Sequence, residues 1–184
     1  MKTILFAGVA AAALASASMA DVTYTMTNQT WTGFNFNEAY TAGSLTGTLT
    51  GASVNVTLNA AVNYTYANDL TVYIAGTPLA LGGMLQCGGF SNLGTALANR
   101  YSWGTGGSSA PGTTMNTTVN FINGGVDMAA NPTMSVWIGN GYGAAGTSGT
   151  WTGTITLIGV NENIPAPGAI ALLGLAGLVG RRRR

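Results

Sequence analysis

The chain has 184 residues, enough for one domain and processing segments, and combines 47% hydrophobic with only 6% charged residues. It contains no histidine, which excludes mechanisms that rely on an imidazole base or an imidazole zinc ligand. Four of the six Lys and Arg residues stand together at the C-terminus, so the rest of the sequence offers no basic footprint for nucleic acid.

The first 20 residues have the pattern of a helical export signal. Lys2 provides the positive start, residues 4–14 form an apolar run, and Ser18 and Ala20 place small side chains before a cleavage point. We therefore expect a signal peptidase to cut after Ala20, which leaves Asp21 as the first residue of a protein exported from the cytoplasm.

Residues 21–163 are expected to form the mature domain. Five acids against the single cation Arg100 give this segment a net charge of about −4, which disfavours binding to nucleic acid or to anionic membranes. The only cysteine, Cys87, cannot form an internal disulfide and is expected to be a small buried side chain. The acids are Asp21, Glu38, Asp69, Asp127 and Glu162.

Apolar and polar residues alternate with period two through most of this domain. Strands therefore have one apolar face and one face of Thr and Asn, and they are separated by Gly-, Asn- and Pro-rich turns. This pattern predicts an all-β fold, an antiparallel β-sandwich. The alternating runs are 22–26, 54–58, 62–66, 70–74, 119–121, 134–138 and 151–157.

Three segments of this domain carry a family resemblance. The segments 54–58, 64–74 and 149–157, the last with Gly149-Thr150-Trp151, resemble the P/Homo B domains of proprotein convertases and exported bacterial proteins. The resemblance implies a jelly-roll-like sandwich, and it implies no protease. Separately, Trp31-Thr32-Gly33 and Trp151-Thr152-Gly153 repeat one tripeptide, which we interpret as two chemically similar edge or pairing strands.

The last 21 residues, 164–184, form a third segment. Pro165 and Pro167 interrupt the domain, and residues 169–180 are a continuous apolar run followed at once by four arginines. The run is shorter than a usual transmembrane helix, but arginine snorkelling allows a short span with a cytoplasmic terminus. An ordinary C-terminal anchor that is never cut is the alternative.

This order of elements resembles the PEP-CTERM sorting signal. The matching residues are Ile164, Pro165, Pro167, Gly168, the apolar run and Arg181, Arg182, Arg183 and Arg184, while Ala166 stands where the family usually has Glu. The resemblance implies processing by an exosortase, transient anchoring in the inner membrane of a Gram-negative bacterium, and association with extracellular polysaccharide.

Candidate binding residues are mostly aromatic. Trp31, Trp103, Trp137 and Tyr142 could stack on sugar rings, although sandwich tryptophans usually belong to the core, and Trp137 falls on the face opposite its apolar neighbours. Asn68 and Asp69 could ligate calcium, but a turn role is favoured for Asp69. No cofactor is expected.

Catalytic candidates are poor. Asp69, Asp127 and Glu38 fall in different segments, whereas glycosidic cleavage needs two carboxyl groups in one cleft. The sequence therefore favours an exported, surface-sorted, non-enzymatic β-sandwich with a structural or matrix-associated role. The alternatives are a carbohydrate-binding module or adhesin and, more remotely, a hydrolase.

Overall fold

The computed structural model describes residues 21–78, 83–91 and 99–163. The expected signal peptide at 1–20 and sorting signal at 164–184 lie outside these residues. The elements, in chain order, are β1 (Val22–Thr32), β2 (Asn35–Tyr40), β3 (Leu45–Val62), the 3-10 helix η1 (Ala67–Asp69), β4 (Leu70–Ala75), β5 (Leu85–Cys87), β6 (Arg100–Tyr101), β7 (Thr113–Asn120), β8 (Val126–Asp127), β9 (Ser135–Asn140) and β10 (Ser148–Glu162).

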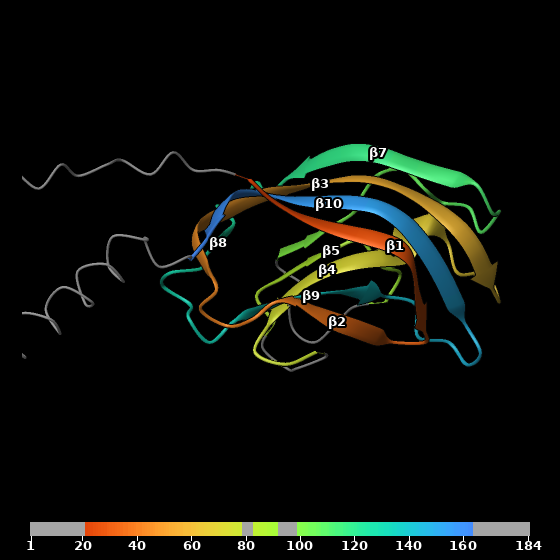
Figure 1. Ribbon diagram of the computed structural model, residues 1–184, viewed down its shortest axis with the longest axis horizontal. Coiled ribbons are helices and arrows are strands. Elements are labelled where there is room, and N and C mark those ends of the chain that lie inside the picture. Colours follow the sequence, from red (N-terminus) through yellow and green to blue (C-terminus); the bar gives the residue numbers. More distant parts are fainter. Residues whose placement is uncertain (1–20, 79–82, 92–98, 164–184) are drawn as a thin grey trace, which may run out of the picture.

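These strands form two facing sheets, which confirms an all-β sandwich. One sheet has the order β1-β10-β3-β7, with β8 also paired to β3, and the other has the order β2-β9-β4-β5-β6. Figure 1 shows the first sheet arching over the second. The pairings are antiparallel except for β5 with β6, which run parallel, so the expectation of a wholly antiparallel sandwich needs this one correction.

The core lies between the sheets and follows the period-two pattern. On β3, Val54, Val56 and Leu58 are buried, whereas Asn55 between them is exposed. Because successive strand residues point to opposite faces, the apolar set meets the inner residues of β4, β5 and β9. Cys87 of β5 is fully buried there, as expected.

The repeated Trp-Thr-Gly tripeptides do lie on pairing strands. β1 and β10 are antiparallel neighbours, and the Trp31 and Trp151 rings meet inside the sandwich with their centroids 5.8 Å apart. On the outer face of the same strands, the Thr30 and Thr150 hydroxyls are 2.7 Å apart. The pairing of β1 with β10 is therefore supported on both faces, by the tryptophan contact inside the sandwich and by the threonine contact outside it.

One expected strand is wrong. Residues 62–66 alternate like a strand, yet β3 ends at Val62, and Asn63 and Tyr64 adopt left-handed backbone conformations with φ of +51° and +61°. The chain reverses there and passes through Tyr66 into η1. A bulky residue with positive φ is uncommon and marks a constrained segment.

The sandwich has two distinct ends (Figure 1). At one end, which we call the cleft end, the loops after β1, β3 and β9 meet. Gly33 and Asn63 both donate hydrogen bonds to the β9–β10 loop there. At the opposite end, which we call the tail end, β1 begins after Asp21 and β10 finishes before Asn163. Both described termini therefore leave from the end opposite the loop cluster.

Among residues 21–78, 83–91 and 99–163, no helix has the length and apolarity needed to cross a membrane.

Candidate functional site

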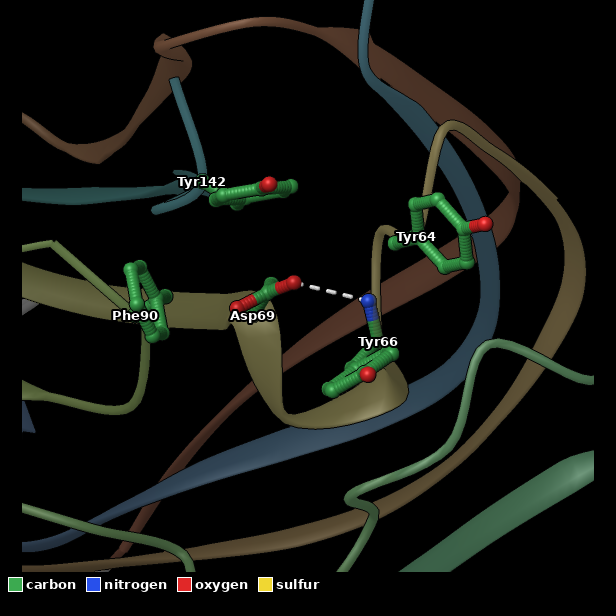
Figure 2. Close-up of a pocket in the computed structure, with 5 residues that line it drawn as sticks. All are labelled: Tyr64, Tyr66, Asp69, Phe90 and Tyr142. Atoms are coloured by element: carbon green, nitrogen blue, oxygen red, sulfur yellow. Dashed lines mark hydrogen bonds between the residues drawn. The ribbon is translucent and has the colours of Figure 1, made fainter. Parts of the chain in front are cut away.

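The loops at the cleft end enclose a small aromatic cleft of about 120 Å³. Tyr64 and Tyr66 come from the β3–η1 loop, Asp69 ends η1, Phe90 follows β5 and Tyr142 follows β9. Figure 2 shows the aromatic rings placed around the Asp69 carboxylate. The Phe90 and Tyr142 rings pack edge to face, with centroids 5.5 Å apart. We call this site the aromatic cleft.

Three of these rings are unusually exposed for aromatic side chains. Tyr64 is 75% exposed, Phe90 72% and Tyr66 40%. Single exposed apolar residues are common on protein surfaces, but several gathered around one concavity indicate a binding surface. The left-handed turn at Tyr64 holds one of these rings at the rim.

Backbone hydrogen bonds fix the loops that carry the rings. Ser91 donates to Gly141 O over 3.0 Å, and Gly141 donates to Asp69 O over 2.8 Å. Gly89 donates to Asn68 O over 2.9 Å. The segment around Phe90 is therefore joined both to η1 and to the β9–β10 loop.

The Asp69 carboxylate connects two ring-bearing segments. It is only 3% exposed, and its Oδ2 accepts a hydrogen bond from the Tyr66 backbone N–H over 2.7 Å (Figure 2). It also accepts one from the Phe90 backbone. Burial raises the pKa of Asp69 from 3.8 to about 6, and the hydrogen bonds from Tyr66 and Phe90 oppose that rise.

A wider groove of about 460 Å³ adjoins the aromatic cleft. It shares Tyr66, Asp69 and Phe90 with the cleft and adds Arg100 of β6. The exposed Arg100 side chain donates from Nη2 to Gly89 O over 2.9 Å and to Phe90 O over 2.8 Å. We call this site the Arg100 groove. Asn68 and Ser102 also line it.

The structure corrects two of the tryptophan candidates and finds the third outside both cavities. Trp31 and Trp103 are each 1% exposed, so neither presents a ring face to a ligand. The Trp103 indole instead donates to Leu70 O over 2.7 Å. Trp137 does lie opposite the core, half-buried in a small outer cluster, but it lines neither the cleft nor the groove. Of the four, only Tyr142 lines the cleft.

Asp69 has the turn role that the sequence favours. With Tyr66 it forms a capping box at η1, and Thr71 donates its hydroxyl to Asp69 O over 2.9 Å. Its carboxylate faces backbone N–H groups, which are donors rather than the oxygen ligands that calcium needs. The Asn68 backbone belongs to the same framework: its N–H donates to Gly106 O and its carbonyl oxygen accepts from Gly89. Within the described ranges, no cluster of three or more His, Cys, Asp or Glu side chains could hold a metal ion.

The three carboxylates considered for hydrolysis do not meet. Asp127 belongs to β8, which pairs with the start of β3 at the tail end, far along the sandwich from Asp69. Glu38 lies on β2 beside Trp137 and lines neither cavity that contains Asp69. Asp69 is thus the one carboxylate of these three in the aromatic cleft.

No known protein family, curated protein or solved structure matches this chain. The aromatic cleft therefore has to be interpreted from its own residues. Sequence reasoning identified Tyr142 as a ligand candidate and missed Tyr64, Tyr66 and Phe90. The first two were assigned to a strand. The signal that could have separated them is Asn63, a residue that tolerates a left-handed conformation, ahead of the turn-forming Asn68-Asp69 pair that ends the segment.

Proposed function

We propose that this protein is an exported, surface-sorted, non-enzymatic β-sandwich that binds extracellular polysaccharide in the aromatic cleft. The observation that carries the proposal is the gathering of Tyr64, Tyr66, Phe90 and Tyr142 around one concavity. A tyrosine combines a flat apolar face with a polar tip, which suits a sugar ring that has apolar C–H faces and polar edges. A single buried carboxylate in the cleft fits binding better than glycosidic cleavage.

The position of the termini supports the same proposal. Gly159 donates to the Asp21 carboxylate over 3.1 Å, and Asn163 donates to Ser44 O over 2.7 Å, so both described termini are held at the tail end. If signal peptidase removes 1–20 and an exosortase processes 164–184, any attachment through the C-terminal segment leaves the aromatic cleft directed away from the membrane. Attachment and binding would then use opposite ends of the domain.

We also propose a jelly-roll-like classification for the sandwich. Strand order supports it, since the first strand of each sheet pairs with one of the last two strands in the chain. The connections β1–β2, β3–β4 and β9–β10 each cross from one sheet to the other. Such crossing is what two Greek keys wound into a double sheet require.

Affinity electrophoresis through gels containing hydroxyethylcellulose, dextran, alginate or polygalacturonate tests the binding proposal. We expect at least one polymer to retard the parent protein, and we expect Tyr64→Ala and Phe90→Ala to weaken that binding about tenfold each through the loss of stacking. Ile122→Ala is the matched control, because Ile122 is 87% exposed, lines neither cavity and follows the end of β7 that lies farther from the aromatic cleft. Unretarded migration of the parent protein in every polymer would overturn the proposal.

Cell fractionation tests the sorting part. We expect the mature protein in the extracellular or surface fraction, starting at Asp21 and shortened within 164–184. Full-length protein confined to the cytoplasm would contradict export, whatever the affinity gels show.

A further inference from the structure

We infer that the Arg100 groove selects an acidic polysaccharide, by pairing the Arg100 guanidinium with a carboxylate on a sugar unit next to the one in the aromatic cleft. This inference rests on the proposed function and names the class of polysaccharide. It comes from the distribution of charge over the two ends of the sandwich and from the continuity of the two cavities.

Charge is segregated along the domain. Three of its five acids, Asp21, Asp127 and Glu162, lie at the tail end, on or beside β1, β8 and β10. Glu38 is on β2, and Asp69 is 3% exposed. The single cation within residues 21–163, Arg100, lines the groove beside the aromatic cleft. A domain with a net charge of about −4 thus presents its positive charge where the proposed ligand binds.

The two cavities form one continuous surface. Both are lined by Tyr66, Asp69 and Phe90, so a chain that leaves the aromatic cleft passes directly into the Arg100 groove. Phe90, 72% exposed, stands at their boundary. A linear polymer can therefore place one sugar ring among the aromatic side chains and its neighbour beside Arg100.

The Arg100 side chain is well positioned for this role. Its Nη2 holds the Gly89 and Phe90 carbonyl oxygens at 2.9 and 2.8 Å, which fixes the guanidinium against the loop that carries Phe90. An arginine keeps its charge at any physiological pH and matches the planar geometry of a carboxylate. Asp69 is the one acid among the described residues that line the groove, and its side chain is buried, so the exposed surface of the groove carries the charge of Arg100.

Polygalacturonate and its fully methyl-esterified form provide a matched pair of probes, because esterification removes the charge and keeps the sugar backbone. We expect the parent protein to bind the acid form about fivefold more tightly at low salt, as for an exposed ion pair, and to lose this preference as the salt concentration rises. In Arg100→Gln the preference should fall below about twofold, whereas Arg100→Lys should keep most of it, because lysine retains the charge.

The outcomes separate the two levels of the proposal. Equal affinity for both forms, with binding still weakened about tenfold by Tyr64→Ala, would overturn the acidic specificity and leave polysaccharide binding intact. An Arg100→Gln preference equal to that of the parent would also overturn the role of Arg100. If the parent protein binds neither of these two forms and no other polymer of the panel, the proposed function is overturned, and this inference with it.

Discussion

Asp69 couples the two segments that carry most of the exposed rings, and its burial has a consequence for stability. The folded state binds the Asp69 proton more tightly than the unfolded chain, because burial raises the folded pKa from 3.8 to about 6. Unfolding therefore releases a proton between pH 4 and pH 6, and the free energy of unfolding falls as the pH rises through that window. The whole effect amounts to about 3 kcal/mol.

We expect Asp69→Asn to remove this pH dependence, since an amide does not titrate. Urea unfolding at intervals from pH 4 to pH 7 measures it: the parent should lose stability across the window, and the variant should show a flatter profile. The variant loses one acceptor for the Tyr66 and Phe90 backbone N–H groups, so its absolute stability is not the readout. Parallel profiles for the two proteins would show that Asp69 does not titrate as inferred.

At the scale of elements, the sequence patterns predicted the sheets better than the loops. Alternation identifies the buried faces of β3 and β10, because strand geometry itself has period two. It does not account for β4 and β9, where all six residues of β4 and five of the six in β9 are buried, so that both faces of these strands are covered. The same alternation misassigned residues 62–66, since nothing in the pattern distinguishes an inward-facing ring from one at the rim of a turn. Tyr64 and Tyr66 could thus be read as core residues although they line the aromatic cleft.

Tryptophan burial depended on contacts that no local pattern contains. Trp103 fits inside because Gly88 leaves room for it: a Cβ on Gly88 would clash with the indole Nε1. Gly88 also has a φ of +82°, which favours glycine at that position. The contact joins residues on either side of the β5–β6 connection, so it becomes visible only in the folded chain.

The β1–β10 pairing contains a matched pair of tryptophans for testing what a buried indole contributes. Trp151 Nε1 donates to Ala67 O over 3.1 Å, whereas Trp31 Nε1 is buried without a hydrogen-bond partner. Replacement by phenylalanine removes similar volume at both positions. In Trp151→Phe it also leaves the Ala67 carbonyl without its indole donor, whereas in Trp31→Phe it removes an unsatisfied donor.

We therefore expect Trp151→Phe to lower the free energy of unfolding more than Trp31→Phe, by about 2 kcal/mol. Urea denaturation of the two variants against the parent protein gives the difference directly. An equal loss, or a larger loss for Trp31→Phe, would mean that packing outweighs hydrogen bonding at this contact.

For the whole molecule, the separation of the two ends is the main consequence of the fold. Neighbouring strands β1, β10 and β3 run the length of one sheet, so a site formed by the loops at one end is a full sheet length from the described termini. A polysaccharide bound at the cleft end would leave the tail end free. Thiol labelling can compare the accessibility of the two ends with and without bound polysaccharide, because the chain has a single cysteine of its own.

Cys87 is fully buried, and burial raises the pKa of its thiol, so the native parent protein should react slowly with maleimide reagents. New cysteines at exposed alanines should react quickly: Ala145→Cys in the β9–β10 loop reports on the cleft end, and Ala130→Cys reports on the tail end. We expect saturating polysaccharide to slow labelling at position 145 several-fold and to leave position 130 unchanged, with mass spectrometry as the readout. Equal protection at both positions, or protection at position 130 alone, would place the polymer away from the aromatic cleft.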